Sequence, residues 1–275
     1  MDELVAGWLA EDVGRGDRTT EAVIDERVSG VAQIEAREAL VVAGLDWARA
    51  CFDAAGGGID WIPKAADGEQ VAAEEVVVRV AGRLRTILTG ERTALNLLAR
   101  LCGIASMTSE YVAAIRGTPA RITDTRKTTP GLRALEKYAV RIGGGSNHRF
   151  GLDDGVLIKD NHIMGAGGIT PAVGAARQRV PHSLLIEVEV ADLDGLDEAL
   201  AAGADAVLLD NMTPNLVAEA VTRAGGKVLL EASGGITLAT VRAYAEAGVD
   251  LISIGALTQR ARASDLALEV ISRGA

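Results

Sequence analysis

Short apolar runs alternate with amphipathic stretches through the second half of the chain. From Arg121 onward the runs are RITDTRK, GVLIKD, LLIEVEV, AVLLD, KVLLEAS and LISIG, and segments such as LDGLDEALAAGAD separate the last four. The ends of these runs are evenly spaced: Glu189 to Asp210 is 21 residues, Asp210 to Ser233 is 23, and Ser233 to Gly255 is 22. Repeating β-α units predict a parallel sheet, most simply a barrel, and the six visible strands do not establish a full eight-fold barrel.

The first part of the chain follows a different pattern. Residues 4–11 and 45–55 predict short helices, SGVAQIEAREALVVAG and ADGEQVAAEEVVVRVAGRLRTIL predict strands, and residues 91–115 predict a long apolar helix. We therefore expect two domains. A mixed α/β domain with its connecting helix occupies residues 1–115, and the barrel occupies residues 116–275.

Composition and charge narrow the function classes. The chain has 275 residues, of which 48% are hydrophobic and 24% charged, the balance of a globular protein with a large core. A net charge of −10 with 3% aromatic residues argues against a nucleic-acid binder, and no apolar run is long enough to span a membrane. Two cysteines are too few for a disulfide framework, and the acidic start is unlike a signal peptide. We therefore expect a cytoplasmic protein.

Positive charge collects in one stretch of this acidic chain. Between Arg121 and His162 there are eight Lys or Arg and five Asp or Glu, so the segment carries +3. Such a segment is expected to bind a small anion, although a solvated, salt-bridged surface would give the same counts. Within it Arg133, Lys137 and Arg141 recur at i, i+4 and i+8 of a predicted helix. A basic stripe of this kind is more often a solvated face than a ligand site.

Polar residues at the strand ends are the candidates for chemistry, because barrel sites form at the C-terminal ends of the strands. In LLIEVEV the period of two puts Glu187 and Glu189 on one face and aliphatic residues on the other, so both carboxylates should point into the barrel. Buried carboxylates need cationic partners, and Lys127 and Lys159 are the expected ones. A purely structural ion-pair lattice is the alternative.

Two glycine-containing turns follow the last two predicted strands. SGGI begins with Ser233, Gly234 and Gly235, IGAL contains Gly255, and each precedes a predicted helix. Loops at this place in barrels often bind phosphate through backbone N–H groups, although a tight turn without a ligand has the same composition. Cations, inward-facing acids and a phosphate loop together indicate a phosphorylated sugar and a second, anionic substrate.

Residues 124–163, DTRKTTPGLRALEKYAVRIGGGSNHRFGLDDGVLIKDNHI, closely resemble the quinolinate phosphoribosyltransferase family, the carboxylating nicotinate-nucleotide pyrophosphorylases. The resemblance extends in order through EDVGRGDRTT, GERTALNLLARLCGIA, IEVEV, LLDNM, LEASGGIT and ISIGALT. It implies an N-terminal α/β sandwich followed by an incomplete α/β barrel. It also implies phosphoribosyl transfer from phosphoribosyl pyrophosphate to quinolinate with loss of CO₂, a step of de novo NAD biosynthesis. Mg²⁺ would be the cofactor, and the assembly would be a homodimer or a hexamer of dimers.

The resemblance also assigns roles to individual residues. The residues that it makes catalytic are Lys127, Lys159, Glu189 and Asp210. Of these, Glu189 and Asp210 would hold the ribose hydroxyls, directly or through the metal. The residues that would hold the quinolinate carboxylates are Arg126, His148, Arg149 and Lys159, with Arg92 from the neighbouring subunit. Those that would cradle the 5′-phosphate are Ser233, Gly234 and Gly255. Gln259 stands where family members commonly have a histidine.

Three other functions stay open at this point. A molybdenum-locus paralogue of the same fold would act on another substrate, although the intact DTRKTTPGLR and GALT favour the quinolinate enzyme. A phospho-sugar lyase or aldolase would use Lys159 to form a Schiff base. A binding or regulatory protein would keep the pocket and show no turnover.

Overall fold

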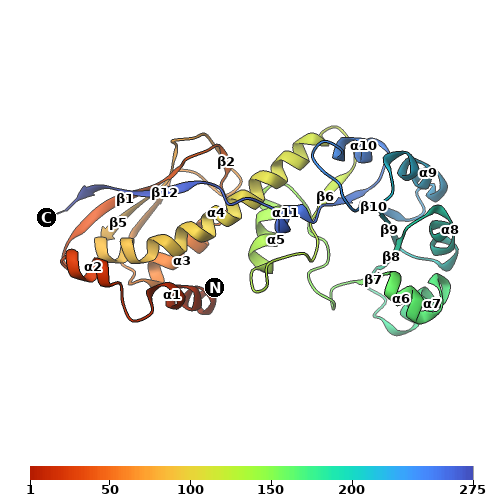
Figure 1. Ribbon diagram of the computed structural model, residues 1–275, viewed down its shortest axis with the longest axis horizontal. Coiled ribbons are helices and arrows are strands. Elements are labelled where there is room, and N and C mark those ends of the chain that lie inside the picture. Colours follow the sequence, from red (N-terminus) through yellow and green to blue (C-terminus); the bar gives the residue numbers. More distant parts are fainter. Residues whose placement is uncertain (275) are drawn as a thin grey trace. The chain divides into compact units, whose positions relative to one another are not determined.

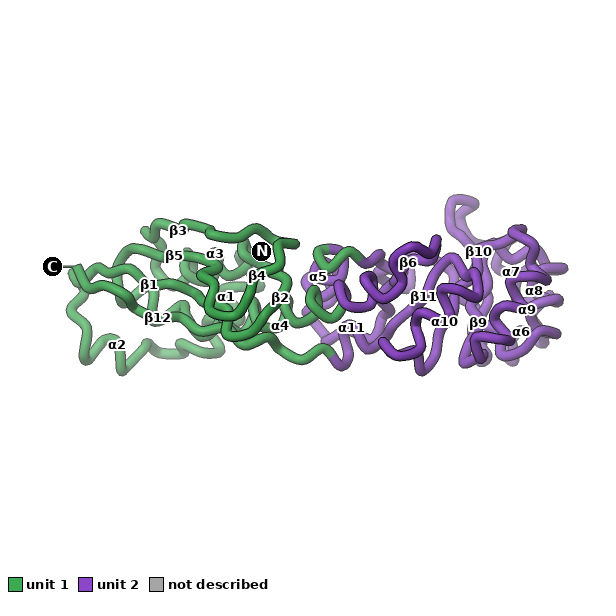
Figure 2. Tube along the Cα trace, turned by 90° about the horizontal axis from the view of Figure 1, so that it is seen from above, with its two compact units in different colours: residues 1–107, 142–144, 261–275 green, residues 108–141, 145–260 purple. Residues whose placement is uncertain are grey.

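The computed structural model describes residues 1–274, and the chain forms two compact units (Figure 1, Figure 2). Unit 1 contains Met1–Met107, Ile142–Gly144 and the chain from Ala261 onward, and unit 2 contains Thr108–Arg141 and Gly145–Arg260. The predicted division at residues 115 and 116 differs from this one, chiefly because the last strand pairs with the first strand of unit 1. Ala275, the end of the predicted barrel domain, lies outside the described residues.

Unit 1 is built on an antiparallel sheet with the strand order β12-β1-β5-β3. The strands are β1 (Ser29–Ala36), β3 (Asp60–Pro63), β5 (Val76–Arg83) and β12 (Leu266–Arg273), and β2 (Leu40–Val41) pairs separately with β4 (Gln70–Val71). Burial alternates along β1, so one face of the sheet is buried. The helices are α1 (Asp2–Val13), α2 (Arg18–Val23), α3 (Leu45–Ala54) and most of α4 (Leu84–Ala114). Helix α4 begins seven residues before its predicted start, so RTIL is helical and not a strand.

Unit 2 is an open parallel barrel with the strand order β6-β11-β10-β9-β8-β7. Its strands are β6 (Arg121–Thr123), β7 (Val156–Ile158), β8 (Ile186–Val190), β9 (Ala206–Asp210), β10 (Leu229–Ser233) and β11 (Leu251–Ser253). β6 and β7 are the two edge strands of this sheet, and they do not pair with each other within the described residues. The free edge of β6 forms a single bridge, from Thr123 to Ser146, so the barrel is not closed. The predicted incomplete parallel α/β barrel with a separate α/β domain is confirmed.

The helices of unit 2 are α5 (Arg133–Ile142), α6 (Asp160–Ala166), α7 (Ile169–Arg179), α8 (Leu193–Ala202), α9 (Pro214–Ala224), α10 (Val241–Glu246) and α11 (Ala256–Gln259). Figure 1 shows α8, α9 and α10 along the outer side of the strands. Local sequence sets their ends: Thr213 caps α9 by accepting from the N–H of Leu216, Pro214 occupies the first turn, and Gly225 ends the helix in the left-handed region. None of the helices in residues 1–274 is long and apolar enough to cross a membrane.

Gly103 in α4 is expected to be a position at which one methyl group destabilises unit 1. A Cβ there would collide with the carbonyl oxygen of Arg262 and lie 3.3 Å from the backbone nitrogen of Ser264. Overpacking against backbone is costly, so Gly103→Ala should lower the free energy of unfolding by about 2 kcal/mol. The matched control is Gly7→Ala in α1, where no atom lies within 4 Å and alanine should stabilise the helix. Equal urea midpoints for the two variants would contradict the expectation.

Candidate active site

A cavity of about 650 Å³ lies at the carboxyl ends of the six parallel strands. Each strand contributes a lining residue at or just past its end: Thr125, Lys159, Glu189, Asp210, Ser233 and Ser253. In-register parallel pairing brings these ends to one edge, as Ser233 pairs with Asp210 and Ser253 with Thr123. The evenly spaced polar strand ends of the sequence therefore meet in one place.

Most of the predicted site residues line this cavity. They are Arg126, Lys127, His148, Arg149, Lys159, Glu189, Asp210, Ser233, Gly234 and Gly235. Gly255 lies behind them, since a Cβ there would come within 3.0 Å of the Lys127 side chain. Arg92 belongs to α4 in unit 1 and is not among the lining residues.

The two arginines that line the cavity have unsatisfied donors. The Nε atoms of Arg126 and Arg149 are buried and have no hydrogen-bond partner, while Nη1 of Arg149 donates to the Gly155 carbonyl at 2.7 Å. Burial, and then the positive charge of Arg126, lower the pKa of the Arg149 guanidinium. Buried donors without acceptors are costly, and guanidinium groups bind carboxylates and phosphates in a bidentate way. This part of the cavity is therefore built to take an anion.

The acidic part of the cavity is only partly as predicted. Nζ of Lys159 forms an ion pair with Oε2 of Glu189, whose side chain is 17% exposed. Glu187 lies 3.2 Å from Nε2 of His148. Lys127 forms no ion pair within residues 1–274, so the expectation that it would pair with a barrel carboxylate is wrong. Lys127 comes after β6 and is exposed at the cavity. The hydrogen-bond partner of Glu187 thus comes from the 146–149 segment inside the open barrel.

The glycine turn after β10 is shaped by close backbone approach. Gly234 has a φ of 96°, and a Cβ there would lie 2.9 Å from the backbone nitrogen of Asn211. Asn211 itself has a φ of 56° and donates from its side chain to Oδ2 of Asp210 at 2.7 Å. The helix predicted after this turn is α10, which begins at Val241, so a short stretch of chain separates the turn from the helix. Backbone groups of the turn, and no helix end, face the cavity.

A buried ion pair that the sequence did not predict holds the loop behind the cavity. Nζ of Lys137 lies 2.5 Å from Oδ1 of Asp124, and both side chains are almost wholly buried. Nζ of Lys137 also donates to the carbonyl of His148 at 3.0 Å, and the His148 N–H donates to Asp124 at 2.8 Å. The interpretation of Lys137 as part of a solvated basic stripe is therefore wrong. Spacing on a helix could not show that Asp124 would be inside and facing it.

Both other members of that stripe also hold the 124–150 segment. Arg133 donates to the Thr128 hydroxyl and the Phe150 carbonyl, and Arg141 donates to Oδ1 of Asn147. Arg133, Lys137 and Arg141 thus stabilise the 124–150 loop. The arginines available to an anion are the two that line the cavity.

Glu231 is a lining residue that was not among the predicted site residues. Its side chain is 2% exposed, and its Oε1 has no hydrogen-bond partner. Burial, and then the negative charge of Glu187, raise the pKa of Glu231 to about 7, against the opposing effect of His148. The signal was present, because Glu231 and Ser233 alternate along LLEAS as Glu187 and Glu189 do along IEVEV.

The pH dependence of stability should report Glu231. A carboxyl whose pKa is raised on folding stabilises the fold while protonated, and this contribution is lost as the pH rises from 4.5 to about 7. Glu231→Gln keeps a neutral side chain there. The difference in free energy of unfolding between the variant and the wild type should therefore shift by about 3 kcal/mol in favour of the variant between pH 4.5 and pH 8. Urea unfolding at several pH values measures this gain, with the exposed Glu219→Gln as the control for charge. A constant difference across that range would contradict the expectation.

The fold and the cavity define an α/β barrel protein with a cavity suited to anions at the carboxyl ends of its strands. The family model described as "Quinolinate phosphoribosyl transferase, C-terminal domain" matches residues 104–269, and that for the N-terminal domain matches residues 17–102. The chain belongs to the quinolinate phosphoribosyl transferase family, which confirms the resemblance seen in its sequence.

Curated relatives and solved structures agree with this family. A Synechocystis sp. protein named probable nicotinate-nucleotide pyrophosphorylase (carboxylating) is 46% identical over 98% of this chain and 92% of its own. The Mycobacterium leprae nicotinate-nucleotide pyrophosphorylase (carboxylating) is 42% identical over 95% and 94%. Among structures, NadC from Streptococcus pyogenes has a TM-score of 0.94 at 38% identity, covering 98% of this chain and 95% of that one. The Francisella tularensis nicotinate-nucleotide pyrophosphorylase has a TM-score of 0.94 at 41% identity, covering 98% and 97%.

Proposed function

We propose that the protein transfers the phosphoribosyl group of phosphoribosyl pyrophosphate to quinolinate, releasing pyrophosphate and CO₂ and forming nicotinate mononucleotide. The observation that carries the proposal is one cavity in which two arginines have buried, unsatisfied Nε donors, together with carboxylates and a glycine turn. Quinolinate has two adjacent carboxylates for the arginines, and a phosphorylated sugar fits the rest. The reaction is the one named for the relatives above.

The charges of the cavity suit each stage of this reaction. Arg126, Arg149 and Lys159 hold the carboxylates of quinolinate. His148, which was also expected to do so, has both ring nitrogens engaged by the protein, so it lines the cavity without a free donor. As the bond from the ribose C1 to pyrophosphate breaks, C1 gains oxocarbenium character, and the carboxylates of Glu189 and Asp210 stabilise it. Lys127 and Lys159 lie where they can neutralise the phosphates. Positioning and electrostatics carry the catalysis, and no covalent enzyme intermediate is needed.

The second half of the reaction follows from the first. The pyridine nitrogen attacks C1, forms the C–N bond and becomes positively charged. When the adjacent carboxylate leaves as CO₂, its bonding electron pair stays on the ring carbon, and the positive nitrogen beside it stabilises this carbanion. The carbanion then takes a proton. Arg149 and Arg126 hold the ring while these bonds change.

Mg²⁺ is part of the same proposal. Glu189 and Asp210 are oxygen donors, and each has one carboxylate oxygen beyond the one engaged by Lys159 or Asn211. Such a donor set fits Mg²⁺, which is usually held by one or two carboxylates and substrate phosphates. When bound, Mg²⁺ would neutralise the charge of the leaving pyrophosphate.

The decisive experiment measures CO₂ release from carboxyl-labelled quinolinate with pure protein. Release should require quinolinate, phosphoribosyl pyrophosphate and Mg²⁺ together, and nicotinate mononucleotide should appear in equal amount. Calorimetric binding of quinolinate without turnover would instead support a binding protein. Turnover of a different acid would support the molybdenum-locus paralogue.

Engagement of Lys159 argues against the lyase alternative. Its Nζ is paired with Glu189 and is not a free nucleophile. Borohydride added with a phospho-sugar should therefore leave Lys159 unlabelled, and labelling there would favour the lyase.

A homodimer or a hexamer of dimers, in which Arg92 reaches a partner's cavity, belongs to the proposal, as does a cytoplasmic location. The Arg92 side chain is 63% exposed, which suits a shared role. Burial raises the pKa of Cys51 to about 11 and that of Cys102 to about 12, so both thiols suit a reducing compartment. Mixing Arg92→Ala with Arg149→Ala subunits tests the sharing. Random exchange should restore about a quarter of the activity, because half of the sites in a heterodimer are then intact.

A further inference from the structure

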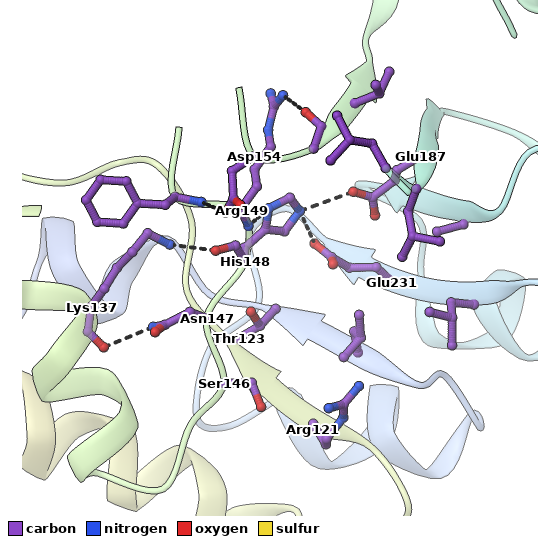
Figure 3. Close-up of a pocket in the computed structure, with 18 of the residues that line it drawn as sticks. Arg121, Thr123, Lys137, Ser146, Asn147, His148, Arg149, Asp154, Glu187 and Glu231 are labelled. Atoms are coloured by element: carbon purple, nitrogen blue, oxygen red, sulfur yellow. Dashed lines mark hydrogen bonds and ion pairs between the residues drawn. The ribbon is translucent and has the colours of Figure 1, made fainter. Parts of the chain in front are cut away.

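A second cavity of about 550 Å³ opens at the amino ends of the barrel strands (Figure 3). The first residues of five strands line it: Arg121, Val156, Ala206, Leu229 and Leu251. Three residues, His148, Arg149 and Glu231, line both this cavity and the one at the carboxyl ends. They therefore lie between the cavity at the carboxyl ends and the cavity at the amino ends of the strands.

Every polar atom of His148 is engaged by the protein. Its N–H donates to Asp124, and its carbonyl accepts from Lys137. In the ring, Nδ1 accepts the backbone N–H of Arg149 at 2.7 Å, and Nε2 faces Oε2 of Glu187 at 3.2 Å and Oε1 of Glu231 at 3.8 Å (Figure 3). The ring thus connects the two barrel carboxylates to the backbone of Arg149.

His148, Glu187 and Glu231 have the composition of a metal site, with ligand atoms within 4.8 Å of one another. The hydrogen bond at Nδ1 argues against a metal there. Because the lone pair of Nδ1 accepts the N–H of Arg149, the proton of the neutral ring is on Nε2. A protonated Nε2 has no lone pair for a metal, and it donates to Glu187 instead. The cluster therefore holds a proton.

The charged groups around the ring keep that proton on Nε2. Nε2 is the ring nitrogen that faces the carboxylates of Glu187 and Glu231, and their negative charges favour a proton at that atom. A second proton would have to enter Nδ1, where the N–H of Arg149 already points. Turning the ring by 180° would put the Cδ2–H group where Nδ1 now lies, so the N–H of Arg149 would lose its acceptor. The two carboxylates thus select both the tautomer and the rotamer.

We propose that Glu187 and Glu231 are positioning residues that act through His148 to fix the backbone of Arg149, and so its guanidinium, at the anion site. The consequence for quinolinate binding rests on the proposed function. The backbone of Arg149 is held by Nδ1 of His148 and its Nη1 by the Gly155 carbonyl, which leaves the unsatisfied Nε for the ligand. Neither carboxylate touches the substrate in this role.

Steady-state kinetics of the full-length protein test the role. Glu187→Met keeps the length of the side chain and removes the acceptor, whereas Glu187→Gln keeps an acceptor for Nε2–H. In Glu187→Met the KM for quinolinate should rise about tenfold or more, and the KM for phosphoribosyl pyrophosphate should change less than about twofold. Glu187→Gln should restore the KM for quinolinate to within about threefold of the wild type. The exposed Glu219→Met is the matched control.

A spectroscopic measurement gives a readout that does not depend on activity. The chain has three histidines, so ¹⁵N spectra can resolve each ring. At pH 8 the ring of His148 should carry its proton on Nε2, and Glu187→Met should move part of the population to the other tautomer. Glu231→Gln should cause a smaller shift in the same direction, because Glu231 is the more distant of the two.

Four outcomes would overturn the inference. They are a wild-type ring protonated on Nδ1, a tightly bound metal lost on Glu231→Gln, an unchanged KM for quinolinate in Glu187→Met, and equal losses in Glu187→Met and Glu187→Gln. Absence of CO₂ release from the wild type would remove the proposed function and leave the tautomer result standing. Normal CO₂ release with unaltered kinetics in Glu187→Met would remove only the positioning role.

Discussion

Glu189→Gln is expected to lower kcat for nicotinate mononucleotide formation by about 10²- to 10³-fold, with both KM values nearly unchanged. Glutamine keeps a hydrogen-bond acceptor for Lys159 and removes the negative charge. That charge matters most when C1 of the ribose becomes positive, which happens only in the transition state. A group that acts there lowers kcat when it is lost and changes substrate binding little.

Initial rates of CO₂ release at varied concentrations of both substrates measure this effect. Glu219→Gln, an exposed substitution on α9, is the control for removing one carboxylate from unit 2. A large rise in the KM for phosphoribosyl pyrophosphate with normal kcat would show that Glu189 binds the ground state only. Full activity would remove Glu189 from the proposed site.

Arg149→Ala is expected to raise the KM for quinolinate about 100-fold, which corresponds to about 3 kcal/mol of binding energy. The guanidinium is partly desolvated and keeps an unsatisfied Nε, so a carboxylate that binds it gains a strong, charge-assisted hydrogen bond. Arg149→Lys keeps the charge without the fork of donors, and it should fall between alanine and the wild type.

Calorimetry with quinolinate alone complements the kinetics of the Arg149 variants. The affinity should fall in step with the rise in KM, and the affinity for phosphoribosyl pyrophosphate should stay nearly constant. If Arg149→Ala lost affinity for phosphoribosyl pyrophosphate and kept it for quinolinate, the arginine would belong to the phosphate side of the cavity.

The local pattern of apolar and polar residues was sufficient to predict the barrel and the residues at the ends of its strands. The repeat of apolar runs placed Glu189, Asp210 and Ser233 at the ends of successive strands, and in-register parallel pairing brings such ends together. Alternation within IEVEV put Glu187 and Glu189 on the interior face, and Lys159 does pair with Glu189. These properties depend on the period of a strand and on the order of the elements, which are local.

Contacts between segments that are distant in the chain could not be predicted from this local pattern. Pairing of β12 with β1 joins residues more than 200 positions apart, and nothing local in LALEVISR names its partner strand. Helical spacing placed Lys137 on a stripe, but burial of the stripe depends on where Asp124 lies in the assembled barrel.

The position of the ring proton on His148 shows most clearly the difference between what the sequence determines and what the tertiary structure determines. The residue types were readable in order along the chain, since His148, Glu187 and Glu231 all stand in segments predicted to meet. Which nitrogen donates, and to which carboxylate, depends on separations of a few tenths of an ångström between three segments. Hydrogen bonds and buried charges are decided at that scale, and only packing of the whole barrel sets it.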